Sequence, residues 1–228
     1  MKHAGKAQHA ALRLILLALG AVLLLVLVGF LARVLGAFVV GLAGFLVTVW
    51  VLFTLFTLYF FRDPEPDVPR GAGLVVSPAH AKVDAIDTIQ EPAFMGGECR
   101  RISMFLSVID VHVQRAPVAG RVALVKHTAG QFLNAMRTDS ALFNENVLVG
   151  IEVSEPGSRR IGVRLIAGLL ARRIVPWAGE GDAVQRGERI SLIQFGSRAD
   201  VYLPHEANIK VKLGDKVVGG ETILATFD

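Results

Sequence analysis

The chain has 228 residues, which is enough for one soluble domain and a membrane segment. Its net charge of +4 resides in residues 1–61, which hold four basic residues and no acidic one, while the other 20 basic residues are balanced by 20 acidic ones. This distribution argues against a nucleic-acid-binding face on the folded domain, and the single Cys99 rules out an intrachain disulfide and a zinc site built on paired cysteines, so we expect no metal.

Two long apolar runs open the chain. Residues 14–32 and 34–61 are each long enough to cross a bilayer, which takes about 20 residues, and only Arg33 separates them. The sequence therefore predicts a cytoplasmic tail and a two-helix transmembrane hairpin over residues 1–62, with one long span as the alternative. Basic residues flank the two outer ends of the hairpin, so we expect both termini on the cytoplasmic face of the inner membrane.

The remainder, residues 63–228, is predicted to be a mainly β domain directly beneath the bilayer. Prolines at 64 and 66 end the helix, and the absence of a long linker favours a lipid substrate. Short β-branched or alternating runs then follow, bounded by Gly, Pro, Asn or Asp. They cover residues 74–76, 83–89, 101–106, 120–125, 147–153 and 161–166.

One internal repeat is visible. Residues 181–188 and 214–221 both read G-D-x-V-x-x-G-E, and each copy precedes an apolar run. Asp and Gly favour a turn at these places, and the valine would enter the core. The pattern resembles the hairpin of biotinyl/lipoyl-type barrel-sandwich domains, which carry a cofactor on a lysine at a hairpin tip. Lys216 does not lie at such a tip, so we expect a barrel-sandwich-like fold without the carrier function; chance recurrence of turn residues is the alternative.

Three polar positions are candidates for chemistry. In Gly196-Ser197 a hydroxyl follows a glycine, and its oxygen could attack the Gly196 carbonyl if a base removed its proton; a tight bend is the alternative. His112 lies two residues after Asp110, and in an extended segment the two side chains would share a face, so the carboxylate could orient or charge-stabilise a general base. A structural histidine is the alternative for His112. His80 lies in a predicted turn between two strands.

Five short motifs follow one another along the chain. They are Arg62-Asp63-Pro64, Ser77-Pro78, Phe105 to Pro117 with Asp110-Val111-His112-Val113 inside it, Gly130-Gln131-Phe132-Leu133-Asn134-Ala135, and Phe195-Gly196-Ser197. Their order resembles the phosphatidylserine decarboxylase proenzymes, and more closely the short bacterial and archaeal branch with an N-terminal membrane hairpin. The resemblance extends from about residue 60 to the C-terminus.

The resemblance implies a self-processing enzyme. In this family the serine hydroxyl attacks the preceding glycine carbonyl, the chain is cut, and a pyruvoyl cofactor remains where the serine stood; here the cut would fall between Gly196 and Ser197. The products, residues 1–196 and 197–228, would stay associated. The pyruvoyl group would withdraw electrons while phosphatidylserine loses CO₂ to become phosphatidylethanolamine, and His112 matches the family histidine that supplies a proton. Sheet edges near the membrane would also favour a homodimer.

One position departs from the family pattern. After Ser-Pro the family usually has Ala-Asp-Gly, whose aspartate belongs to the processing machinery, whereas this chain has Ala79-His80-Ala81. A histidine cannot replace the aspartate as the anion that stabilises an imidazolium. Either His80 acts as the base itself, or processing is slow, or the chain is an uncleaved or non-catalytic lipid-binding homologue. The sequence leaves these alternatives open.

Overall fold

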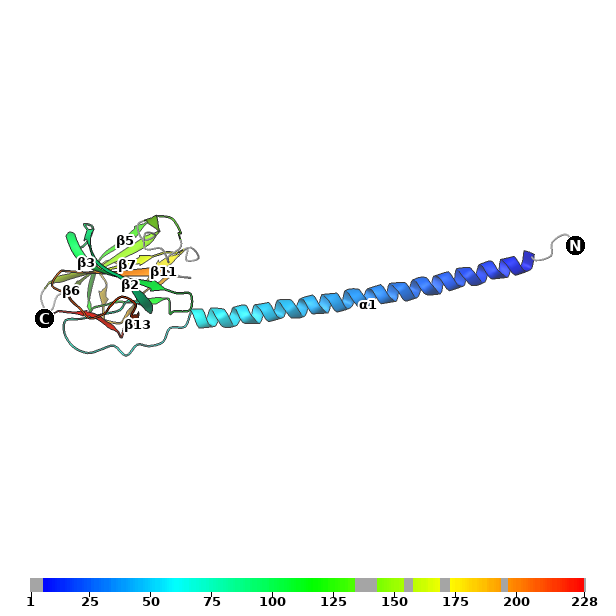
Figure 1. Cartoon of the computed structure of the whole chain (residues 1–228), viewed down its shortest axis with the longest axis horizontal. Helices are drawn as coiled ribbons and strands as arrows, with labels where there is room; N and C mark the ends of the chain where they lie inside the picture. The colour runs from blue at the N-terminus through cyan, green and yellow to red at the C-terminus, as the bar shows by residue number, and fades with distance from the viewer. Residues whose placement is uncertain (1–5, 134–142, 154–157, 169–172, 194–196, 228) are drawn as a thin grey trace. The chain divides into compact units, whose positions relative to one another are not determined.

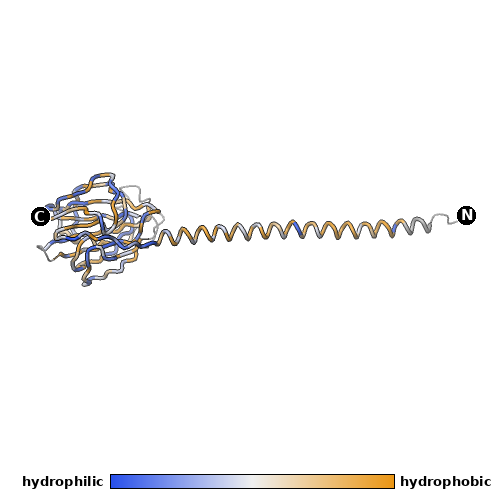
Figure 2. Tube along the Cα trace, turned by 90° about the horizontal axis from the view of Figure 1, so that it is seen from below, coloured by the Kyte–Doolittle hydropathy of each residue, from blue (hydrophilic) through white to orange (hydrophobic). Residues whose placement is uncertain are grey.

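The computed structural model describes residues 6–133, 143–153, 158–168, 173–193 and 197–227, and the chain divides into two compact units, Met1–Thr57 and Leu58–Asp228. Helix α1, Lys6–Phe60, makes up most of the first unit (Figure 1). Its stretch Leu12–Phe60 contains an 18-residue window with a mean hydropathy of 3.2 and is long and apolar enough to cross a membrane. Hydrophobic residues continue along almost its whole length (Figure 2), which supports membrane association.

The structure does not show the predicted two-helix hairpin. Helix α1 instead continues through Arg33 and Gly36 without a break. The segment contains no proline, and a single glycine weakens a helix by only about 1 kcal/mol, so no residue here forces a turn. Even the polar side chains bond within the helix, since the hydroxyls of Thr48 and Thr54 each donate to the carbonyl four residues earlier at 2.9 Å.

The second unit is built from strands, which confirms the mainly β prediction and all six of the predicted strand runs. The strands in the described residues are β1 Leu74–Val76, β2 Ala81–Glu91, β3 Gly97–Leu106, β4 Val113–Arg115, β5 Gly120–Thr128, β6 Asn146–Val153, β7 Arg159–Ile166, β8 Ile174–Pro176, β9 Ala183–Val184, β10 Arg189–Ile193, β11 Ser197–Leu203, β12 Asn208–Ile209, β13 Lys216–Val217 and β14 Ile223–Thr226.

The strands form one curled eight-stranded sheet and two small sheets. The large sheet has the order β13-β2-β3-β11-β7-β6-β5-β9, and the small ones are β1-β14-β12 and β4-β10-β8. The large sheet consists of two halves with the same strand arrangement. Counted inward from the two edges, β13 corresponds to β9, β2 to β5, β3 to β6 and β11 to β7. The small sheets correspond in the same way. Figure 1 shows the large sheet curling around a core that takes Met104 from β3, Val149 from β6 and Val201 from β11.

The sequence repeat is a structural repeat, but it does not build the expected lipoyl-type domain. In each copy an aspartate carboxylate accepts a backbone N–H three residues earlier at 2.8 Å, in Asp182 and in Asp215. The valine of each copy is buried in a two-residue strand. The short strand within each copy, β9 or β13, forms one of the two opposite edges of a single sheet. The two copies therefore do not lie on facing sheets of a barrel sandwich. Lys216 is paired with Lys82 within the sheet.

A buried arginine fastens the segment after the helix to this domain. Arg115 in β4 is 2% exposed and donates to the Asp63 carboxylate at 2.6 Å, to the Pro64 carbonyl at 2.8 Å and to the Gly187 carbonyl at 3.0 Å. Arg189 also pairs with Asp63. Because a buried cation is costly unless it is paired, these contacts hold residues 63 and 64 against the sheet.

Two glycines of the repeats, Gly187 in the first copy and Gly214 at the start of the second, differ in how closely the segment after the helix packs on them. Gly187 has a φ of +81°, and a Cβ there would overlap Val68; Gly214 has a φ of +91° and open space around it. We expect Gly214→Ala to cost about 1–2 kcal/mol of unfolding free energy, which is the price of the left-handed backbone alone. Gly187→Ala should cost about 1–3 kcal/mol more, because Val68 must move. Denaturant unfolding of both variants in detergent micelles measures the difference; equal losses would contradict this packing.

Candidate active site

Two antiparallel strand pairs confine the candidate residues to one place. Leu106 at the end of β3 pairs with Ser197 at the start of β11. On the other side, Val113 at the start of β4 pairs with Leu192 in β10. Residues 107–112, which include His112, therefore join β3 to β4 between these two pairs, and the His112 carbonyl accepts the Ile193 N–H at 3.1 Å. Gly196 is outside the described residues, as is Asn134 of the fourth motif.

Ser197 is a buried serine with an unpaired hydroxyl. It is 0% exposed, and in the described part of the chain its Oγ has no hydrogen-bond partner. By strand alternation its side chain shares the face of Ala199 and Val201, which belong to the core. A buried hydroxyl without a partner costs about 1–3 kcal/mol, so Ser197 is poorly explained as a structural residue.

A hydrogen bond to the His112 ring defines which of its two nitrogens carries the proton. Its ring is 1% exposed and packs on Phe60, with ring centroids 4.2 Å apart. Nδ1 lies 2.8 Å from the main-chain carbonyl oxygen of Asp110, so Nδ1 must carry the proton and the neutral ring has its acceptor lone pair on Nε2. Burial lowers the pKa of His112 below 6.5, against the opposing effects of the Asp110 hydrogen bond and charge. At pH 7 the ring is therefore neutral and able to accept a proton at Nε2.

His80 has the opposite arrangement. Its Nδ1 accepts the backbone N–H of Gly219 at 3.3 Å, so the proton of the neutral ring lies on Nε2. Burial lowers the pKa of His80, while the charges of Asp110 and Glu221 raise it. Asp110 thus acts on both imidazoles. The hydrogen bonds distinguish the two rings, because Nδ1 carries the proton in neutral His112, whereas Nε2 carries it in neutral His80.

The expected role of the Asp110 side chain needs a correction. The sequence predicted that its carboxylate would orient His112 from the same face of an extended segment. Residues 107–110 instead form a turn, in which the carboxylate accepts the Ser107 N–H at 2.8 Å and the Asp110 N–H donates to the Ser107 carbonyl at 3.0 Å. The main-chain carbonyl of Asp110 orients the ring. The carboxylate stabilises the turn and contributes its charge to both histidines.

Two residues of the site escaped the sequence analysis. Phe60 was only part of the predicted apolar run 34–61, yet its ring covers His112. Arg62 was named only as part of the first motif, yet its guanidinium donates to the Ile109 carbonyl at 2.7 Å and its charge lowers the pKa of both histidines. No local pattern reveals these contacts, which depend on the position of residues 58–62 in the folded unit.

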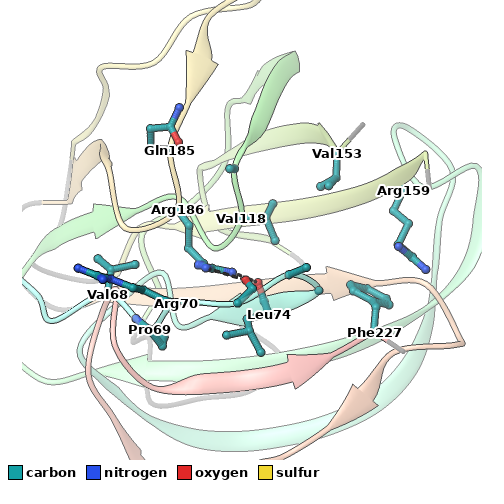
Figure 3. A pocket seen from close by; sticks show the side chains of 14 residues that line it. Val68, Pro69, Arg70, Leu74, Val118, Val153, Arg159, Gln185, Arg186 and Phe227 are labelled. Atoms are coloured by element: carbon teal, nitrogen blue, oxygen red, sulfur yellow. Dashed lines mark hydrogen bonds between the residues drawn. The ribbon is translucent and has the colours of Figure 1, made fainter. Parts of the chain in front are cut away.

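A separate pocket of about 320 Å³ lies outside this site (Figure 3). Its lining includes Arg70, Arg159 and Arg186, and Arg186 donates to the carbonyls of Gly71 and Leu74 at 2.9 and 3.2 Å. None of Ser197, His112 and His80 lines it. The strand pairs that hold Ser197 and the His112 segment lie instead where β3 meets β11 and β4 meets β10.

Known proteins share this chain's sequence along most of its length. A family model described as phosphatidylserine decarboxylase matches residues 53–225. A protein of Desulfotalea psychrophila named phosphatidylserine decarboxylase proenzyme is 45% identical over 176 residues, which are 77% of this chain and 81% of that protein. A protein of Symbiobacterium thermophilum with the same name is 43% identical over 203 residues, 89% of this chain and 88% of that protein.

The packing of Phe60 on His112 predicts a measurable pKa change. We expect Phe60→Ala to expose the imidazole and raise its pKa toward 6.5, because burial is the main cause of the lowered value. In the unmodified protein the lowered pKa of His112 makes the free energy of unfolding depend on pH. This free energy decreases as pH falls through the folded-state pKa, because the unfolded chain binds the proton more readily. NMR titration of labelled histidines in micelles measures this, with Phe53→Ala in the same helix as the control. An unchanged His112 pKa in Phe60→Ala would contradict the contact.

Proposed function

The chain belongs to the phosphatidylserine decarboxylase family, and we propose that it is a proenzyme whose Ser197 becomes a pyruvoyl group by self-cleavage. It is a carboxy-lyase that decarboxylates phosphatidylserine, and the product is phosphatidylethanolamine. The observation that carries the proposal is the unpaired, buried hydroxyl of Ser197, which strand pairing confines beside the segment that holds His112. The alternative of an uncleaved or non-catalytic homologue is not favoured, since the relatives are named as proenzymes.

In the proposed cleavage, Ser197 Oγ attacks the carbonyl carbon of Gly196. The peptide C–N bond breaks, an ester forms, and the hydroxyl proton passes by way of a base to the freed amine. Elimination then releases the carboxylate of Gly196 and leaves a dehydrated residue, which water converts to the pyruvoyl group with loss of ammonia. A pyruvoyl group suits this position, because its formation removes the buried Ser197 hydroxyl, which has no hydrogen-bond partner in the described part of the chain.

We assign the base to His112 and not to His80. Neutral His112 has its lone pair on Nε2, whereas the available nitrogen of His80 carries a proton. The pyruvoyl group supplies an electron-withdrawing carbonyl during loss of CO₂. After Nε2 of His112 has taken up a proton, it can return that proton to the carbon that lost CO₂. Asp110, whose charge favours a protonated His112, supplies the carboxylate that position 80 lacks.

The two products of cleavage would remain one folded unit. Residues 197–228 contain β11, which pairs with β3 and β7 in the large sheet, and β13 and β14, which pair with β2 and β1. All partners belong to residues 1–196, so separation would break these pairings. A homodimer stays a prediction. The edges β9 and β13 are only two residues long, which leaves little strand for edge-to-edge pairing.

The assignment of roles predicts distinct processing defects. We expect the unmodified protein to yield a short chain that begins at residue 197 with a blocked, ketone-bearing terminus. Ser197→Ala should remain whole, and His112→Ala should cleave at least about 100-fold more slowly, as loss of a general base implies. His80→Ala should cleave within a few-fold of the unmodified rate. Denaturing electrophoresis and mass spectrometry follow all four proteins. Normal cleavage of His112→Ala together with an intact His80→Ala chain would reverse the assignment.

We further propose that the β domain faces the cytoplasm and that the apolar segment crosses the inner membrane twice. The stretch Leu12–Phe60 has 49 residues, more than twice the roughly 20 that one crossing takes, and basic residues lie at both of its ends. Two crossings require a bend in α1 near Arg33 when the chain is in a bilayer.

This topology predicts opposite labelling of two introduced cysteines. Arg33→Cys should react with a membrane-impermeant maleimide added outside intact cells. Arg70→Cys, in the β domain, should react only after permeabilisation. The native Cys99 is buried, and burial raises its pKa to about 11, so the unmodified protein gives the background. An Arg33→Cys protein that stays unlabelled in intact cells would argue for a single crossing.

A further inference from the structure

The turn that precedes His112 has an unusual tip. In the described part of residues 63–227, the exposed large apolar side chains are Val108, Ile109, Phe143, Trp177 and Leu213. Only Val108 and Ile109 are adjacent in sequence, and Ile109 is 64% exposed. Exposed turns normally carry polar residues or glycine. An apolar pair at the tip of a turn therefore needs an explanation other than local structure.

The tip is fastened to the end of the apolar helix. Arg62 donates to the Ile109 carbonyl at 2.7 Å and to the Tyr59 carbonyl at 2.9 Å, and its guanidinium lies over the Tyr59 ring at 3.9 Å. All of these residues belong to the compact unit Leu58–Asp228. Tyr and Arg at the end of a membrane helix are typical of the headgroup level. The carbonyl of Ile109 therefore lies at the depth of that interfacial pair.

The same contacts connect the tip to the chemistry. Ile109 precedes Asp110, whose carbonyl orients His112, and the His112 ring packs on Phe60 from the last turn of α1. A site held away from the bilayer would require the lipid to leave the membrane, at about 0.8 kcal/mol for each CH₂ group exposed to water. A site held at headgroup depth avoids this cost, because the serine headgroup is already there.

We propose that Val108 and Ile109 insert into the headgroup region of the bilayer and hold the His112 turn against the membrane surface. The occupant of this apolar surface is the lipid bilayer. The functional consequence of insertion, access to lipid in a membrane, rests on the proposed function. Insertion itself can be measured without any activity.

Insertion is tested directly with a fluorescent label. Ile109→Cys and Leu213→Cys are each labelled with an environment-sensitive dye and reconstituted into phosphatidylcholine–phosphatidylglycerol vesicles. Leu213 is a matched control, since it is 65% exposed and also lies in a turn. We expect blue-shifted emission and protection from an aqueous quencher at position 109 only. Equal quenching at both positions overturns the proposal, whatever the activity of the protein.

The functional consequence is tested by the way in which the substrate is presented. Val108→Ser/Ile109→Ser and Leu213→Ser are assayed on phosphatidylserine in vesicles and on a short-chain phosphatidylserine below its micelle concentration. We expect the vesicle-to-monomer activity ratio to fall on the order of tenfold in the double variant, as loss of two partly inserted side chains implies, and to stay unchanged in Leu213→Ser. An unchanged ratio in both overturns the proposal. Loss of both activities with the label at 109 still protected would count against the proposed function and leave insertion standing.

Discussion

Strand pairing decides where this protein can do chemistry. The pair Leu106–Ser197 and the pair Val113–Leu192 enclose both the hydroxyl and the histidine segment. Neither pair is local in sequence, so the site exists only after β3, β4, β10 and β11 have assembled into their sheets. In the proposed mechanism, an unfolded chain would therefore lack a base near Ser197. This requirement would explain how a proenzyme can contain its own cleavage machinery without being cut before it has folded.

The last turn of the helix takes part in the site as well as in anchoring. Phe60 removes His112 from water, and Arg62 adds a positive charge that lowers the same pKa. Both effects favour the neutral imidazole. Arg115 fixes the chain just beyond, at Asp63 and Pro64, so the position of Phe60 over the ring is not left to a loose linker. The residues at the end of helix α1 and just after it thus influence the protonation state of His112 directly.

The sequence predicted what depends on local pattern and missed what depends on pairing. The β strands were predictable because β-branched runs alternate between turn residues. The orienting role predicted for the Asp110 carboxylate was wrong because it assumed an extended segment, whereas the carboxylate accepts the Ser107 N–H and closes a turn. Its charge does favour a protonated His112, as expected. The hairpin was inferred from length and stays a prediction, because the structure shows one continuous helix and no proline marks the position of a bend. Only the family resemblance brought His112 and Ser197 together, since their proximity comes from strands distant in sequence.

The symmetry of the strand order shows which part of the domain the proposed cleavage would divide. One half of the domain, β4 to β10, is continuous in the chain, while its counterpart combines β1 to β3 with β11 to β14. Cleavage before β11 would divide only this second half, at the junction where it resumes after the inserted half. Every residue of β11 is buried, and the strand lies at the centre of the large sheet between β3 and β7. The proposed cut would therefore create a new terminus at the buried start of β11, where pairing of the rest of the strand with β3 and β7 would hold it in the sheet.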